Sequence, residues 1–188
     1  MRSERTAWIR PLAILLGLAA AGCARQPHPP ALQRNTGTYQ DAKEGFRFDP
    51  PAGWTQNLRG TPAPENRSRE CQLVKYARAG GRLAFFLVSV IDLAPSTDFN
   101  AFLAARSPGK DWHRLSLTET LEVDHLAGVR DVFTGTWDRE PVIREIVSVR
   151  RGNSVYFFTA TFPANDEEVR KQVRQAVASV VWEEEPKS

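Results

Sequence analysis

Residues 82–93 read RLAFFLVSVIDL and form the most apolar stretch of the chain after its N-terminal segment. A run so rich in β-branched and aromatic residues is typical of a central strand whose two faces are both covered. Ala79-Gly80-Gly81 precedes it and connects it to another predicted strand at 71–78, because glycine supplies the positive φ that a tight hairpin requires. The sequence therefore centres the fold on an antiparallel hairpin.

Further strands are predicted on both sides of this hairpin. Short strands at 46–48 and 54–58 precede it and are separated by Pro50-Pro51, since proline interrupts a strand. Alternating apolar and polar residues predict longer strands after it, at 113–123, 128–137, 142–150 and 154–162. Gly152-Asn153 between the last two is a strong hairpin signal.

Two helices complete the prediction. Ser96 or Thr97 begins the first, which runs to about Ala105 with an apolar stripe of phenylalanine and leucine. Asn165 begins the second, and Glu168 completes a capping box with it. Consecutive hairpins with these helices predict an α+β domain over 45–182, an antiparallel β-sheet covered by helices, followed by a solvated tail at 183–188.

The N-terminal segment at 1–22 has the features of an export signal. Three arginines lie within the first ten residues, and a ten-residue apolar run, LAILLGLAAA, follows at 12–21. A membrane-spanning helix needs about 20 apolar residues, so this run suits the apolar region of a signal peptide.

Ala20-Ala21-Gly22-Cys23 follows this run and resembles the lipobox of bacterial lipoproteins. The resemblance implies cleavage between Gly22 and Cys23 and attachment of a diacylglycerol to Cys23, which makes the membrane a partner through the lipid anchor. The family usually has leucine three residues before the cysteine, where this chain has Ala20. An ordinary secretory signal is the alternative. Ala24 follows the cysteine where an aspartate would retain lipoproteins at the inner membrane, so the resemblance implies the outer membrane, periplasmic side.

Residues 23–44 are predicted to be the lipidated cysteine and a flexible tether, because the segment is rich in proline, glutamine and asparagine. The whole chain has a formal charge of +3, with 25 Lys+Arg and 22 Asp+Glu. Removing the leader brings the remainder close to neutrality. The charge therefore gives no reason to expect nucleic acid as a partner.

Gly45-Phe46-Arg47-Phe48, followed by Pro51-Ala52-Gly53-Trp54, resembles the opening of PsbP-like domains. The predicted order of strands and helices resembles that family as well, over about 45–182. The resemblance implies a PsbP-like α/β/α sandwich in which Pro51, Gly53 and Trp54 turn the chain and fill one edge of the core. Founding members of the family are extrinsic subunits of photosystem II, and many bacterial relatives have no assigned activity, so no functional residue is carried over.

The sequence contains few candidate catalytic or metal-binding residues. His125 lies in a predicted turn near Glu122 and Asp124, which are possible metal ligands, but an exposed hairpin turn explains these residues as well. Cys71 begins a predicted strand and is interpreted as a small buried apolar residue rather than a reactive thiol. We therefore expect no catalytic residue, no metal site and no cofactor.

Three functions remain open from the sequence. The first is a non-catalytic, membrane-tethered binding or assembly module of the bacterial cell envelope, acting on a partner that the sequence does not identify. The second is a carrier of a small apolar ligand in a pocket between sheet and helices. The third is an envelope hydrolase that uses His125 and nearby carboxylates.

Overall fold

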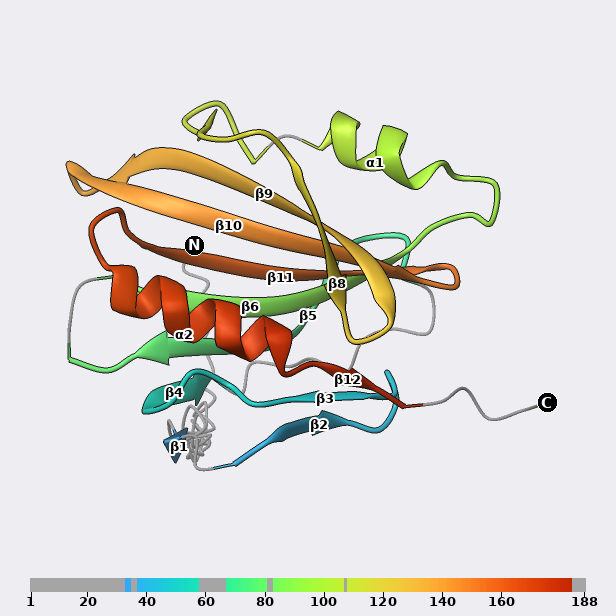
Figure 1. The fold of residues 1–188 in the computed structure, drawn as a ribbon, viewed down its shortest axis with the longest axis horizontal. Coiled ribbons are helices and arrows are strands. Elements are labelled where there is room, and N and C mark those ends of the chain that lie inside the picture. The colour runs from blue at the N-terminus through green and yellow to red at the C-terminus, as the bar shows by residue number, and fades with distance from the viewer. Residues whose placement is uncertain (1–32, 35–36, 58–66, 81–82, 107, 184–188) are drawn as a thin grey trace, which may run out of the picture.

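The computed structural model describes residues 33–34, 37–57, 67–80, 83–106 and 108–183. Antiparallel strands dominate these residues, and α2 lies across the longer strands (Figure 1). The elements in chain order are β1 Gln33–Arg34, β2 Tyr39–Asp41, β3 Phe46–Phe48, β4 Trp54–Asn57, β5 Cys71–Arg78, β6 Phe85–Asp92, α1 Phe99–Ala105, β7 His113–Arg114, β8 Glu119–Val123, β9 Leu126–Trp137, β10 Glu140–Arg151, β11 Ser154–Pro163, α2 Glu167–Ala178 and β12 Val181–Trp182.

The main sheet has the strand order β1-β4-β5-β6-β11-β10-β9-β7, and β8 also pairs with β9. The predicted hairpins are confirmed: β5 pairs with β6, and β10 pairs with β11 around Gly152, whose φ is +59°. The strand predicted from the opening sequence is β6, which lies inside the sheet between β5 and β11. Its residues facing α2 are fully buried, whereas Phe85 and Leu87 on its other face are half-buried.

A second, three-stranded sheet in the order β12-β3-β2 lies beside α2 on the same face of the main sheet (Figure 1). Aromatic side chains fill the space between the two sheets. Phe46 and Phe48 of β3 are fully buried and meet rings of the main sheet edge-on, with centroids 5.7–6.5 Å apart, at Tyr76, Phe86, Tyr156 and Phe158. Such edge-to-face pairs add to the free energy gained by burying the rings.

The prediction that helices cover the sheet is wrong. The described chain is mostly strand, and α1 is a seven-residue helix with no buried residue. One face of the main sheet is covered by α2 together with the small sheet, so an α/β/α sandwich does not form. The difference arises because α1 buries no residue, while the buried Phe46 and Phe48 of β3 occupy part of the layer beside α2.

The Pro51–Trp54 segment forms a turn between β3 and β4. Pro51 is buried, Gly53 has a φ of +76°, and the amide of Trp54 donates to the carbonyl of Pro51 at 3.2 Å. The Trp54 ring is 1 % exposed, and its Nε1 donates to Gln172 Oε1 of α2 at 2.9 Å. These residues therefore tie the end of the main sheet to α2.

Several predicted boundaries move. Tyr39–Asp41 forms β2 and pairs with β3, so the folded part begins earlier than residue 45. The strand predicted over 113–123 is two strands, because β7 and β8 pair with β9 in registers that differ by two residues: Arg114 lies opposite Phe133, whereas Glu119 lies opposite Arg130. Asp98 and Asp166 begin the helices, rather than Ser96, Thr97 or Asn165, because their carboxylates accept from the first-turn amides.

Candidate functional site

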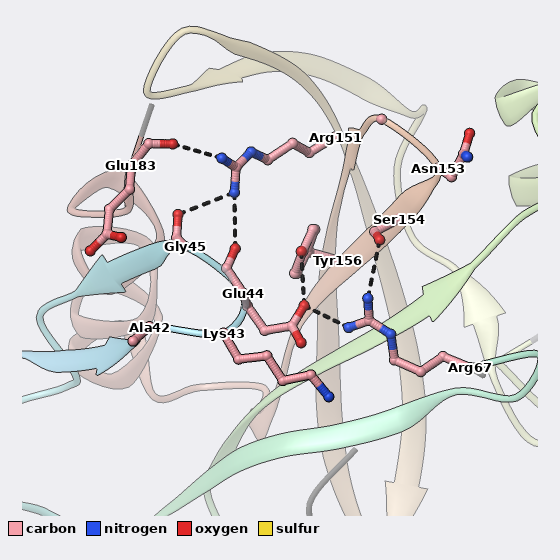
Figure 2. A pocket seen from close by; sticks show the side chains of 11 residues that line it. Ala42, Lys43, Glu44, Gly45, Arg67, Arg151, Asn153, Ser154, Tyr156 and Glu183 are labelled. Atoms are coloured by element: carbon pink, nitrogen blue, oxygen red, sulfur yellow. Dashed lines mark hydrogen bonds and ion pairs between the residues drawn. The ribbon is translucent and has the colours of Figure 1, made fainter. Parts of the chain in front are cut away.

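A polar hollow of about 460 Å³ lies at one end of the main sheet (Figure 2). The turn between β2 and β3, the turn between β10 and β11, and the end of β12 surround it. Its lining consists of Ala42, Lys43, Glu44, Gly45, Arg67, Arg151, Gly152, Asn153, Ser154, Tyr156 and Glu183. Most of these side chains are polar or charged, so the hollow is a candidate site for recognition of a polar group.

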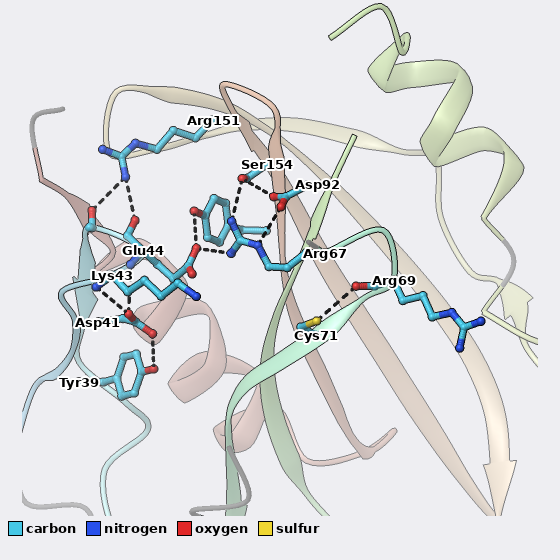
Figure 3. A network of polar contacts seen from close by, with 12 residues as sticks. Tyr39, Asp41, Lys43, Glu44, Arg67, Arg69, Cys71, Asp92, Arg151 and Ser154 are labelled. Atoms are coloured by element: carbon cyan, nitrogen blue, oxygen red, sulfur yellow. Dashed lines mark hydrogen bonds and ion pairs between the residues drawn. The ribbon is translucent and has the colours of Figure 1, made fainter. Parts of the chain in front are cut away.

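The β2–β3 turn directs Glu44 into the hollow. Asp41 Oδ1 accepts hydrogen bonds from the amides of Lys43 and Glu44, each at 3.1 Å, and the amide of Gly45 donates to the carbonyl of Asp41 at 2.9 Å (Figure 3). Gly45 has a φ of +62°, a conformation that glycine adopts without steric cost. As a result the Glu44 side chain is only 3 % exposed.

The Glu44 carboxylate is held by two donors. Arg67 Nη1 lies 2.6 Å from Glu44 Oε2, and the hydroxyl of Tyr156 donates to the same oxygen at 3.0 Å (Figure 2). Arg67 also forms an ion pair with Asp92 through Nε at 3.0 Å, and Ser154 Oγ donates to the other oxygen of Asp92 at 2.7 Å. One network therefore joins the small sheet to β6 and β11 of the main sheet.

The network changes the pKa of two of its members. Burial lowers the pKa of Arg67, but the hydrogen bonds to Glu44 and Asp92 outweigh burial, so the pKa of the guanidinium is raised. Burial, followed by the charge of the Glu44 carboxylate, raises the pKa of the Tyr156 hydroxyl above its ordinary value. Both groups therefore keep their protons throughout the physiological pH range.

Arg151 closes the other side of the hollow. Its Nη1 donates to the carbonyls of Glu44 at 2.9 Å and Gly45 at 3.2 Å, and its Nη2 donates to the carbonyl of Glu183 at 2.6 Å. The guanidinium also lies 5.5 Å from the centre of the Trp182 ring. Arg151 thus fastens β12 and the β2–β3 turn to the end of β10.

This arrangement suits recognition better than proton transfer. The Glu44 carboxylate is occupied by Arg67 and Tyr156, and Arg151 is occupied by main-chain carbonyls. A fixed set of polar groups can present a constant pattern of charge to a ligand without rearranging. Sequence reasoning missed the site, because Glu44 lies in the predicted tether and Arg67 lies between the strands predicted at 54–58 and 71–78.

The residues predicted to be lipidated and cleaved, Cys23 and Gly22, lie outside the described residues. Among the residues that are described, no helix is long and apolar enough to cross a membrane. Cys71 is a free cysteine, partly buried against the core, and its Sγ lies 3.3 Å from the carbonyl oxygen of Arg69 (Figure 3).

The histidines of the described chain do not contribute to the hollow. His113 and His125 are exposed, and His125 Nδ1 lies 3.1 Å from Asp124 Oδ2. The same carboxylate oxygen accepts a hydrogen bond from the amide of Trp182 at 3.0 Å, so Asp124 holds β12 in place. Within the described ranges, no group of three or more His, Cys, Asp or Glu residues could hold a metal ion.

Comparison with known proteins adds information on the fold. No protein-family model matches the sequence, and no curated protein matches it either. The structure is similar to cyanobacterial PsbP from Synechocystis sp. PCC 6803, with a TM-score of 0.57 and 11% identity over 78% of this chain and 91% of that one. It is also similar to a protein from Bacteroides thetaiotaomicron, with a TM-score of 0.51 and 10% identity over 75% of this chain.

The chain spans about half of the Bacteroides protein, 46% of its length. At these identities the similarity shows a shared fold alone. The PsbP-like fold expected from Gly45–Phe48 and Pro51–Trp54 therefore has structural support, while the function of either neighbour is not transferred.

Proposed function

We propose that this protein is a non-catalytic binding or assembly module of the bacterial cell envelope, held at a membrane by a lipid on Cys23. The observation that supports the binding role is the polar hollow, whose buried Glu44 is fixed by Arg67 and Tyr156. The hollow is lined by residues of the main sheet and of the β2–β3 turn in the small sheet. Lys43 and Asn153 are exposed on its rim, where a partner can reach them.

The lipobox supports the location, and the position of β1 limits the length of the proposed tether. Because β1 begins at Gln33 and pairs with β4, nine residues separate Cys23 from the folded sheet rather than about twenty. A fully extended chain of that length spans at most about 35 Å. The domain would then act within a few nanometres of the membrane that holds the lipid.

The anchor is tested by replacing Cys23 with alanine. The Cys23→Ala variant should accumulate as uncleaved precursor and should incorporate no labelled fatty acid in cells. Normal processing of this variant would contradict the lipoprotein assignment but would leave the binding role untouched.

The binding role is tested by crosslinking in cells. A photo-reactive amino acid at Asn153, on the rim of the hollow, should give a discrete crosslinked partner that mass spectrometry identifies. The matched control places the same group at Lys171, an exposed position on α2. Equal products at both positions, or no product at Asn153 in cells that express the protein normally, would contradict the proposal.

The apolar-carrier alternative requires a pocket between the main sheet and the layer that covers it. Phe46, Phe48, Phe86 and Phe158 fill that layer, and all four are at most 1 % exposed. The observed hollow is polar and lies at the end of the sheet instead. The geometry therefore favours recognition of a polar partner at the rim over storage of an apolar ligand.

A further inference from the structure

The face of the main sheet opposite α2 carries several aromatic side chains. Strand register places Phe85, Phe133 and Phe157 on it, and Trp112 packs against it at Gly135, where an added Cβ would lie 2.9 Å from Trp112 Cε3. Trp137 at the end of β9 belongs to the same face, since it lies two residues beyond Gly135.

Cations of this chain lie over four of these five rings. Lys75 Nζ is 4.6 Å from the centre of the Phe85 ring, and the guanidinium carbons of Arg114, Arg106 and Arg144 lie 5.1, 4.1 and 3.9 Å from the centres of Phe133, Phe157 and Trp112. A cation within about 6 Å of a ring centre is attracted to its face. Pairing of an aromatic ring with a cation is therefore the rule on this face.

Trp137 differs from the other four rings. In the described part of the chain no cation lies over it, and its side chain is 55 % exposed. It borders an apolar hollow of about 320 Å³, the Trp137 pocket, whose lining is Leu83, Trp137, Asp138, Glu140, Val142 and Pro163. Apart from the tryptophan, the pocket combines three apolar side chains with two exposed carboxylates, Asp138 and Glu140.

We infer that the Trp137 pocket binds an arginine or lysine side chain of a partner protein, presented on an apolar segment. The indole supplies the ring face, Asp138 and Glu140 supply opposite charge, and Leu83, Val142 and Pro163 accept the aliphatic stem of the cation. Exposed tryptophans in such pockets are frequent centres of protein–protein binding energy. The inference depends on neither the anchor at Cys23 nor the polar hollow.

Charge distinguishes this partner from a lipid surface. Two carboxylates beside Trp137 would be repelled by anionic headgroups, whereas they attract a cationic side chain. The turn that carries Asp138 is also held in an unusual conformation, with φ of +49° at Asp138 and +67° at Arg139. The backbone conformation therefore fixes the position from which the Asp138 side chain extends. A recognition site requires such preorganisation.

The test is a binding titration with the purified full-length chain. The probe is the peptide Gly-Leu-Arg-Leu-Gly with an uncharged dye, and the control peptide contains citrulline, which has the shape of arginine without its charge. We expect the arginine peptide to bind roughly five- to tenfold more tightly by fluorescence anisotropy. Equal affinity of the two peptides would overturn the inference.

Variants locate the site. Trp137→Ala and the double variant Asp138→Asn/Glu140→Gln should each abolish the preference for arginine over citrulline, while Trp112→Phe should keep it. These pocket residues are exposed, so the variants should fold, and an unchanged circular dichroism spectrum verifies this. A preference for arginine that persists without Trp137 would overturn the inference.

Two other occupants are tested directly. Tighter peptide binding by the Arg82→Ala variant would show that a cation of this chain itself fills the pocket. Quenching of emission by nitroxide-labelled lipid in phosphatidylethanolamine–phosphatidylglycerol vesicles, lost in Trp137→Phe, would assign the pocket to the membrane. Either result would overturn the inference.

Discussion

Strand β10 connects two contrasting ends of the main sheet. Arg151 at its last residue lies in the polar hollow, and Glu140 at its first residue lies in the Trp137 pocket, roughly 35 Å away along the strand. At the hollow, charged groups bind other groups of the same chain, as Glu44 does with Arg67. At the pocket, Asp138 and Glu140 are exposed. Charge stabilises the fold at one end and remains accessible to a partner at the other.

The backbone shows the same contrast. The positive φ values at the hollow occur at glycines, Gly45 at +62° and Gly152 at +59°. At the pocket they occur at Asp138 and Arg139, which carry side chains and pay a steric cost for this conformation. One end is therefore optimised for stability, and the other retains strain where a partner could use it.

The largest effect is expected from breaking the ion pair at the hollow. Glu44→Ala leaves the largely buried guanidinium of Arg67 without one of its two carboxylates, so we expect a loss of about 3 kcal/mol in the free energy of unfolding. Urea titration followed by circular dichroism measures it. Glu140→Ala at the exposed end is the matched control and should change stability by less than about 0.5 kcal/mol. Similar losses for both would remove the contrast between the ends.

Gly45 and Gly152 both line the hollow, and comparing their alanine substitutions tests the role of Arg151 there. At Gly45 an added Cβ would lie 3.1 Å from Arg151 Nη1, whereas at Gly152 it would meet nothing within 4 Å. Both substitutions by alanine strain a positive φ, but only Gly45→Ala also displaces the arginine. We expect losses of about 2 kcal/mol for Gly45→Ala and about 1 kcal/mol for Gly152→Ala in the same titration. A larger loss at Gly152 would contradict the clamping role of Arg151.

Alkaline pH should destabilise the fold, in part through Tyr156 at the hollow. Burial first, and then the charge of Glu44, raises the pKa of Tyr156, and burial also raises the pKa of Tyr39 and Tyr76. The folded protein keeps these protons above pH 10, where the unfolded chain loses them, so this contribution is complete below pH 10 and is lost as the pH rises further.

Each such tyrosine should lower the free energy of unfolding by about 1.4 kcal/mol per pH unit above 10. Urea titrations between pH 9 and 11 measure the slope, and Tyr156→Phe should reduce it by one tyrosine's share. A phenolate absorbance that appears near pH 10 in the folded protein would contradict the expected burial effect.

Much of the main sheet could be predicted from local signals. The apolar run at 85–92 and the Gly152 turn are properties of neighbouring residues, and they specify β6 and the β10–β11 hairpin. The layer that covers the sheet was predicted incorrectly, because it depends on contacts distant in sequence. β3 pairs with β12, for example, which follows it by more than 130 residues.

The candidate sites were harder to predict, for the same physical reason. Glu44 has a polar neighbourhood in the sequence, and only its contacts with Arg67 and Tyr156 make it a buried carboxylate. Trp137 reads as an alternating strand residue, and its exposure results from its place at the end of β9. The lipobox at Cys23 is a purely local motif, so it could be recognised in the sequence and stays a prediction.

The smallest effect is expected at the pocket, where stability should increase. Replacing Asp138-Arg139 with Asn-Gly gives the turn residues that prefer positive φ at both positions, so we expect a gain of about 0.5–1 kcal/mol in the free energy of unfolding. Because the change also removes one carboxylate of the Trp137 pocket, it should weaken the preference for the arginine peptide at the same time. The single variant Arg139→Gly keeps Asp138 and should gain stability while the peptide preference stays. A gain of stability with unchanged binding in the double variant would mean that the strained turn serves no recognition, and the two ends of β10 would then differ in stability alone.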